Sequence, residues 1–377
     1  MQKKLTALAA LAAASLSSAF AADITTYGVI NTGLSYTRAD TSVSETTDTF
    51  EMDAGNYLGS RFGLKGSEEI NDRLTVGFVL ENGFSSDTGA LGDGGRLFGR
   101  EASIWLRDDV LGTLRFGRLT ALTGSTGTSG LMAGKFSATS TGWGVMWGHN
   151  AVFAGKFLRL DNVVMYSTPK WAGLQLHAQY SSGIDQETEE DGEENSGSAT
   201  RYMGLGAQYF TRPFSTIAVV DSYRYADTAE DPSLGAYLSL AYDFEVVKVF
   251  ATGNYFRDMR YLGKAAVDDG IAESAVFGNG VAKDGYALNF GVTAPIASGK
   301  LYAAVGYMDA ESSADADKAM KRYTVSVGYD YNLSKRTVFY VGAGYMLDRY
   351  EDFGADVAAS DEDAAKYGVT FGLSHRF

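Results

Sequence analysis

The segment Tyr323-Thr324-Val325-Ser326-Val327-Gly328-Tyr329-Asp330-Tyr331 decides the fold class of this chain. Apolar or aromatic side chains stand at every second position, and small or polar side chains stand between them. Successive side chains of an extended strand point to opposite faces, so this segment has one apolar and one polar face. The same alternation runs through residues 367–377 at the end of the chain. A period of two over nine or more residues predicts β-strands.

Strands of this kind repeat along the whole chain. We count sixteen, an even number, at residues 23–36, 56–69, 73–84, 96–107, 112–118, 159–168, 173–182, 200–211, 215–226, 233–243, 245–258, 284–295, 300–310, 321–332, 337–349 and 365–377. Short connections alternate with long ones, which fall at 37–55, 85–95, 119–158, 183–199, 227–232, 259–283, 311–320 and 350–364. This wiring predicts an all-β fold, an antiparallel transmembrane β-barrel of sixteen strands in one domain. A soluble β-sandwich, the main rival fold, seldom joins so many long hairpins in one unit.

The first residues predict export from the cytoplasm. Lys3 and Lys4 precede a run of Leu, Ala, Thr and Ser residues, and Ala19-Phe20-Ala21 follows it. A positive start, a short apolar stretch and small residues around a cleavage point are typical of a secretory signal peptide. We therefore predict a signal peptide at residues 1–21 and the barrel at residues 22–377. Beyond the signal peptide, no segment approaches the roughly 18 consecutive apolar residues that a membrane helix needs.

Composition excludes several classes of function. The chain of 377 residues has 45 Gly, 23 Tyr, 21 Phe, only 4 Pro and no Cys, and its net charge is -14. The absence of Cys argues against a disulfide scaffold and rules out a thiol nucleophile. An acidic chain is not expected to bind nucleic acid, which requires a basic surface. The three histidines fall in no catalytic or metal-binding motif, so we predict that the chain is neither an enzyme nor a metalloprotein.

Five segments resemble the general diffusion porins of Gram-negative bacteria, in particular those of β-proteobacteria. In the order and spacing of that family they are residues 57–69, 98–102, 112–118, 159–169 and 372–377. The resemblance implies a homotrimer of sixteen-stranded barrels in the outer membrane, in contact with lipid and lipopolysaccharide. It also implies that the third long loop, 119–158, folds into the lumen. The implied function is passive diffusion of ions and small hydrophilic solutes, which requires no cofactor.

The resemblance also implies a pore constriction. By motif position, Arg61, Arg100 and Arg159 match the family's ladder of lumen-facing arginines, and alternation supports this for Arg61 and Arg159. The same alternation places Glu101 on the outer face. Further constriction candidates are Arg115, Arg118 and Lys135.

The loop 119–158 departs from the family pattern. General porins usually carry carboxylates in this loop, opposite the arginines, whereas no Asp or Glu occurs here between Asp109 and Asp161. One hypothesis is therefore a basic constriction that favours anions despite the acidic chain. The alternative is that acids on the barrel wall, such as Asp53, Glu81 or Asp161, replace the missing ones.

Two other features complete the predictions. Gly372 and Phe377 lie where outer-membrane strands carry their assembly signal, which the outer-membrane assembly machinery reads. The acidic run 185–194 is predicted to be a solvated surface loop. Two other functions stay open. One is a substrate-selective porin in which Trp143, Trp147 or a track of tyrosines contacts sugars or anionic solutes. The other is a plugged barrel that acts as an adhesin or enzyme.

Overall fold

A computed structural model describes residues 23–41, 46–140, 142–157, 159–185, 193–226, 231–263, 277, 280–351 and 361–377. The predicted signal peptide and most of the acidic run 185–194 lie outside the described residues. Among the described residues, no helix is long and apolar enough to cross a membrane. Within these ranges, helical structure comprises the single turns η2 (Asp93–Gly95), η3 (Ala133–Lys135) and α2 (His149–Val152), and Phe277 is also helical.

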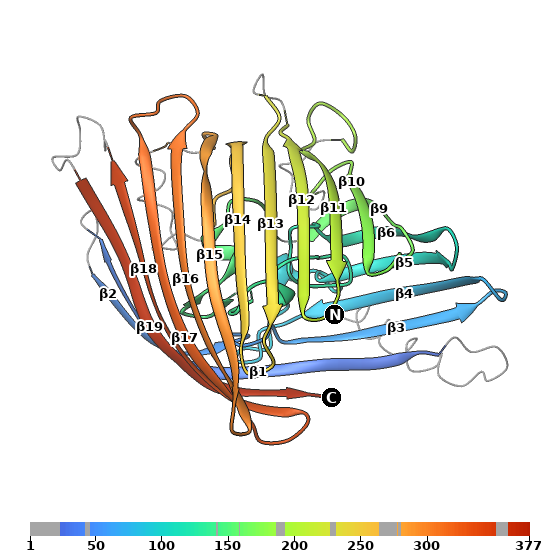
Figure 1. The fold of residues 1–377 in the computed structure, drawn as a ribbon, viewed down its shortest axis with the longest axis horizontal. Helices are drawn as coiled ribbons and strands as arrows, with labels where there is room; N and C mark the ends of the chain where they lie inside the picture. Colours follow the sequence, from blue (N-terminus) through green and yellow to red (C-terminus); the bar gives the residue numbers. More distant parts are fainter. Residues whose placement is uncertain are drawn as a thin grey trace, which may run out of the picture.

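Seventeen strand segments form one antiparallel sheet that closes on itself (Figure 1). They are β1 (Thr25–Thr41), β2 (Thr47–Ala54), β3 (Arg61–Glu69), β4 (Leu74–Gly83), β5 (Glu101–Asp108), β6 (Gly112–Thr120), β9 (Arg159–Ser167), β10 (Leu174–Ser181), β11 (Arg201–Phe210), β12 (Phe214–Arg224), β13 (Leu234–Asp243), β14 (Lys248–Met259), β15 (Lys283–Ile296), β16 (Gly299–Ser312), β17 (Ala319–Asn332), β18 (Thr337–Glu351) and β19 (Asp361–Arg376). Pairing of β1 with β19, from Val29↔Arg376 to Thr41↔Ala364, closes the barrel. The short pair β7 (Gly142–Trp143) and β8 (Met146–Trp147) lies outside this sheet.

The barrel has the sixteen strand positions that the sequence predicts, because β2 and β3 share one of them. Both pair with β1, β2 toward its end and β3 toward its start. The prediction was wrong in detail here, since β2 falls in the expected loop 37–55 and the predicted strand 56–69 begins only at Arg61. Asn31 explains the interruption between β2 and β3. Its side-chain Oδ1 accepts a hydrogen bond from Tyr57 N at 3.2 Å, so this backbone N–H bonds to a side chain and not to a carbonyl of the adjacent strand.

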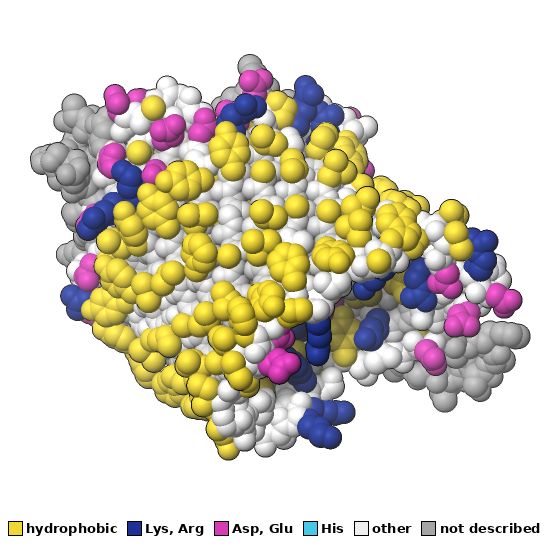
Figure 2. All heavy atoms as spheres, in the orientation of Figure 1, with side chains coloured by type: hydrophobic (Ala, Val, Ile, Leu, Met, Phe, Trp, Pro, Cys, Tyr) yellow, Lys and Arg dark blue, Asp and Glu magenta, His cyan; other side chains and the backbone are white. Residues whose placement is uncertain are grey.

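The wall of the barrel is apolar outside and polar inside. Along β17, Tyr323, Val325 and Val327 are exposed, whereas Thr324 and Ser326 are buried. Figure 2 shows hydrophobic side chains gathered over the outer face of the strands and charged side chains toward the rims. This reverses the pattern of a water-soluble domain, and it is the pattern of a barrel whose outer surface contacts lipid.

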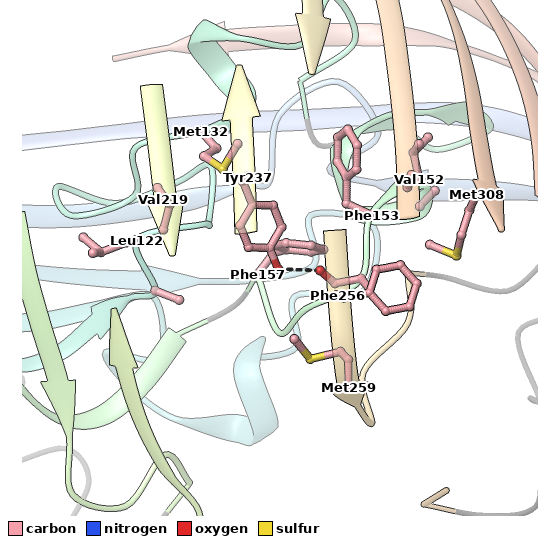
Figure 3. Packing of buried hydrophobic residues seen from close by; sticks show 14 of the residues in the cluster. Leu122, Met132, Val152, Phe153, Phe157, Val219, Tyr237, Phe256, Met259 and Met308 are labelled. Carbon is pink, nitrogen blue, oxygen red and sulfur yellow. Dashed lines mark hydrogen bonds between the residues drawn. The ribbon is translucent and has the colours of Figure 1, made fainter. Parts of the chain in front are cut away.

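The segment between β6 and β9 packs against the inner side of the wall. Its backbone bonds to inward-facing side chains of three strands: Ala154 N donates to Asn254 on β14 at 3.0 Å, Trp147 N to Ser326 on β17 at 2.7 Å, and Ala154 O accepts from Tyr237 on β13 at 2.6 Å. Figure 3 shows its apolar side chains, including Phe153 and Phe157, among those of the wall.

A glycine permits this close packing. Gly155 has φ +134°, and a Cβ at this position would lie 2.6 Å from the Tyr237 hydroxyl. Any other residue would therefore meet both backbone strain and a clash.

Candidate channel constriction

A cavity of about 890 Å³ lies between this inner segment and the wall formed by β1, β3, β4, β5 and β9. On the wall side its lining includes Arg61, Glu81, Arg100 and Arg159. The inner segment contributes only uncharged residues to the lining: Ser125, Thr126, Gly127, Thr128, Gly134, Ser140, Asn150 and Phe157. The charge at this cavity therefore comes from the barrel wall.

Glu81 is the carboxylate at the centre of the arginine group. Arg100 Nε lies 2.6 Å from Glu81 Oε1, and Arg61 Nε lies 3.7 Å from Oε2. Tyr27 donates a hydrogen bond to the same Oε2 at 3.0 Å. A single carboxylate thus serves two guanidinium groups, which leaves their combined charge only half balanced.

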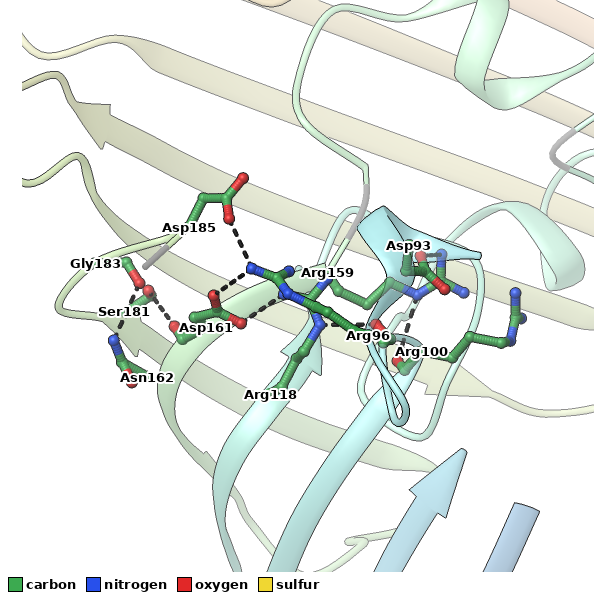
Figure 4. A network of polar contacts seen from close by, with 11 residues as sticks. Asp93, Arg96, Arg100, Arg118, Arg159, Asp161, Asn162, Ser181, Gly183 and Asp185 are labelled. Carbon is green, nitrogen blue, oxygen red and sulfur yellow. Dashed lines mark hydrogen bonds and ion pairs between the residues drawn. The ribbon is translucent and has the colours of Figure 1, made fainter. Parts of the chain in front are cut away.

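Arg159 is held in a similar way. Its Nη1 lies 3.7 Å from Asp93 Oδ1, and its Nε donates to the Arg100 carbonyl at 3.3 Å (Figure 4). Its Nη2 is buried and makes no hydrogen bond with the described residues. The structure therefore brings Arg61, Arg100 and Arg159 together at one cavity, as their motif positions predict.

Two more arginines, Arg96 and Arg118, form a neighbouring network of ion pairs outside the cavity lining. Asp161 accepts from Arg118 Nη1 at 2.5 Å and from Arg96 Nη2 at 3.2 Å, and Arg96 also contacts Asp185 at 2.9 Å (Figure 4). Arg118 is thus close to the constriction residues but does not line the cavity. Arg96 and Asp93 were not singled out from the sequence, because they fall where a regular strand or a loop was expected.

Two other sequence candidates lie elsewhere. Arg115 on β6 is paired in register with Trp105 and does not line the cavity. Lys135 is exposed, with its Nζ 5.2 Å from the centre of the Phe210 ring. The structure therefore does not bring either of them to the three arginines.

Glu101 corrects the sequence analysis, which placed it on the outer face. It is 1% exposed and accepts hydrogen bonds from Thr128 N at 2.9 Å, Thr128 Oγ1 at 2.6 Å and Ser103 Oγ at 2.8 Å. The alternation failed because β5 begins only at Glu101, so Arg100 and Glu101 both face inward. Glu101 fastens the inner segment to one side of the barrel.

A second anchor lies on the opposite side and was missed in the sequence. Arg322 on β17 and Asp348 on β18 are both 0% exposed and form a two-pronged ion pair at 2.6 and 2.8 Å. Arg322 Nη1 also donates to the Ala151 carbonyl of the inner segment at 2.7 Å. The available signal was that both residues occupy inward positions on adjacent predicted strands.

The cavity lining has an excess of positive charge. Five cationic side chains (Arg61, Lys65, Arg100, Arg159 and Arg376) face two carboxylates (Glu81 and Glu101). Of the wall acids considered from the sequence, Glu81 pairs with Arg61 and Arg100, and Asp161 pairs with Arg96 and Arg118, whereas Asp53 lines a different cavity. Wall acids therefore replace the missing loop acids in part, without cancelling the positive charge.

Comparison with known proteins identifies the family. A model of the Gram-negative porins matches residues 7–352. An outer membrane porin protein of Bordetella pertussis is 31% identical over the full length of both chains. Among solved structures, the anion-selective porin from Comamonas acidovorans aligns with a TM-score of 0.67 at 20% identity, covering 95% of this chain and 100% of its own. The trimer form of OmpT from Vibrio cholerae aligns with a TM-score of 0.58 at 15% identity, covering 95% and 100%. The chain therefore belongs to the Gram-negative porin family and is a β-barrel channel of the bacterial outer membrane.

Proposed function

We propose that this channel lets ions and small hydrophilic solutes diffuse passively and that its narrowest part prefers anions. The observation that carries the proposal is that cationic side chains outnumber anionic ones by three in the lining of the 890 Å³ cavity. In a narrow aqueous passage between low-dielectric walls, such charges focus their field on passing ions. They therefore lower the barrier for anions and raise it for cations. The acidic charge of the whole chain acts mainly at the rims, where water and salt screen it.

The inner segment defines the width of the passage in this proposal. Its contacts with β13, β14 and β17 hold it across the inside of the barrel, opposite Arg61, Arg100 and Arg159. Because it contributes no carboxylate to the cavity, no acid on that side opposes the arginines. The anion-selective porin from Comamonas acidovorans has the same fold, and its selectivity agrees with this proposal.

The substrate-selective alternative, as far as it depends on the tryptophans, finds little support. Trp143 and Trp147 are 3% and 5% exposed. Trp143 packs edge-on against Tyr57 and Tyr302, with ring centres 4.6 and 4.5 Å away. The Trp143 ring is therefore covered by aromatic neighbours, and both tryptophans expose little surface to a solute. The fold and family likewise favour a channel over an enzyme or adhesin.

Assembly is the second part of the proposal. We infer a homotrimer because the trimer form of OmpT shares the fold.

We also infer that Gly372 and Phe377 belong to the signal for the assembly machinery, and that lipid and lipopolysaccharide surround the barrel. A Cβ at Gly372 would lie 2.5 Å from the Thr32 carbonyl, and Phe377 N donates to Gly28 O at 3.1 Å where the barrel closes. Deletion of Phe377 should therefore lower the yield of folded barrel, and a normal yield would contradict the assignment.

Single-channel recording tests the channel and its preference together. Purified protein in a planar bilayer under a KCl gradient should conduct and should give a reversal potential of the sign expected for chloride. Three equal closing steps would support the trimer. A reversal potential of the opposite sign would contradict anion preference, and absence of conductance from folded protein would contradict an open channel.

A further inference from the structure

A second cluster of positive charge lies at the end of the barrel that carries the short turns. Lys300 follows the turn between β15 and β16, Lys335 and Arg336 form the turn between β17 and β18, and Arg376 lies at the end of β19. All four side chains are exposed, and together they line a separate cavity of about 250 Å³. We call these four residues the mouth cluster.

The mouth cluster is held in place by the backbone and by neighbouring side chains. Arg376 N donates to the Arg336 carbonyl at 2.9 Å, which joins the end of β19 to the β17–β18 turn. Asn332 donates from N at 3.0 Å and from Nδ2 at 2.8 Å to the Ser298 carbonyl, which joins that turn to the β15–β16 turn. Three separate parts of the chain are thus fixed around one small cavity.

Acids close to this cluster balance its charges only in part. Within the part of the chain that the structure describes, none of the four cations lies within 4.0 Å of a carboxylate oxygen. Among the described residues that line the 250 Å³ cavity, Asp330 is the one with a side-chain carboxylate, and its Oδ2 accepts from both Tyr57 at 2.9 Å and Tyr302 at 2.5 Å. The two phenols therefore hold Asp330 in place, and four cationic side chains face this one carboxylate in the lining.

A buried hydroxyl group adds a hydrogen-bonding site. Ser374 lines the same cavity and is 2% exposed, and its Oγ makes no hydrogen bond with any described residue. A buried polar group without a partner costs free energy, so such a group at a cavity points to a bound water, ion or ligand. A hydroxyl group beside four cations is well suited to donate to an oxyanion.

We propose that this cavity is a binding subsite for a small oxyanion that carries about two negative charges, with inorganic phosphate as the simplest member of the class. Four convergent cations favour a multiply charged anion over chloride, because each additional charge is attracted by all of them. The subsite lies on the route of the proposed anion channel, since Arg376 and Tyr57 line both this cavity and the 890 Å³ cavity. The inference rests on the proposed channel only for access of the anion to the cavity.

Phosphorus-31 NMR of inorganic phosphate, titrated with the purified detergent-solubilised protein, tests the subsite directly. We expect saturable line broadening that the double variant Lys335→Ser/Arg336→Ser weakens about tenfold or more, because two charge-assisted contacts are lost. Ser374→Ala should weaken binding by a smaller factor. The matched control Lys170→Ser/Arg212→Ser also removes two exposed cations from short turns, but neither of them lines the cavity, and it should leave binding unchanged.

The outcomes separate this inference from the proposed anion preference. Broadening that is absent in the unaltered protein, or weakened equally by the control variant, would overturn the subsite. So would binding that survives Lys335→Ser/Arg336→Ser and disappears only in Arg61→Ser/Arg100→Ser/Arg159→Ser. A cation-selective reversal potential together with broadening that depends on Lys335 and Arg336 would leave the subsite standing and refute the preference. Migration of unheated protein as a folded barrel in gel electrophoresis verifies each variant.

Discussion

Arg322 and three of the arginines that line the cavity all face inward, but their surroundings differ. Arg322 is 0% exposed and fully paired with Asp348, and it binds the inner segment through the Ala151 carbonyl. Arg61, Arg100 and Arg159 line an open cavity, and nearby carboxylates balance them only in part. The same residue type on the same face of the wall thus holds the structure together in one place and charges the passage in the other. Access to water and the number of carboxylates nearby make the difference.

The largest loss of stability is expected for the fully buried ion pair of Arg322 and Asp348. Arg322→Ala would leave Asp348 buried without its partner, so we expect a loss of about 3–5 kcal/mol in the free energy of unfolding. Denaturant unfolding of the barrel in detergent measures this loss. The reversal potential should change little, because Arg322 does not line the cavity.

A paired substitution sharpens this test. Arg322→Met/Asp348→Leu removes both charges and should recover most of the stability, since apolar residues of similar volume often replace a buried ion pair without loss. Equal stability of Arg322→Ala and the unaltered protein would show that the pair does not anchor the inner segment.

The next effect concerns pH. His149 lies in the inner segment, packed between the rings of Phe153 and Phe157, with its Nε2 3.0 Å from the Thr123 carbonyl. Burial lowers the pKa of His149 from its usual 6.5 to about 4. Between these values the unfolded chain binds more protons than the folded one, so stability is complete above about pH 6.5 and is lost as pH falls toward 4.

The expected loss for His149 reaches about 3 kcal/mol at pH 4. It is measured as the difference in unfolding free energy between the unaltered protein and His149→Phe, which has no titrating group at this position. As pH falls from 7 to 4, the unaltered protein should lose about 3 kcal/mol of stability relative to His149→Phe. A constant difference between pH 7 and pH 4 would contradict the buried, neutral histidine.

Glu101 combines the two roles, since it lines the cavity and also anchors the inner segment. Glu101→Gln should weaken its hydrogen bonds to Thr128 and cost about 1–2 kcal/mol. It also removes one negative charge from the cavity, so it should raise anion preference and increase current noise in single-channel recording. Unchanged noise and reversal potential would show that Glu101 has neither role.

Much of this architecture follows from the sequence. Alternation along segments such as 323–331 predicts the sixteen strand positions and the inward face, and the motif positions predict that Arg61, Arg100 and Arg159 meet. Alternation applies only inside a regular strand, however. It therefore misplaced Glu101, the first residue of β5, and missed the interruption before Arg61, which depends on the side chain of Asn31.

The alternation also does not predict that Arg322 is buried in an ion pair while Arg61, Arg100 and Arg159 line a cavity. Arg322 and Arg61 both occupy polar positions of amphipathic strands, and nothing in the alternation shows which of them meets water. That depends on where the inner segment packs, which in turn depends on contacts between residues far apart in the chain, such as Trp147 N with Ser326 at 2.7 Å.

The central claim is that Arg61, Arg100 and Arg159 give the channel its anion preference. The most direct test is the reversal potential of Arg61→Ser/Arg100→Ser/Arg159→Ser under a KCl gradient, beside Lys170→Ser as a control outside the cavity. Loss of three cations leaves two cationic side chains against two carboxylates in the lining, so we expect the anion preference to disappear in the triple variant and to persist in the control. An anion preference of unchanged size in the triple variant would contradict the account.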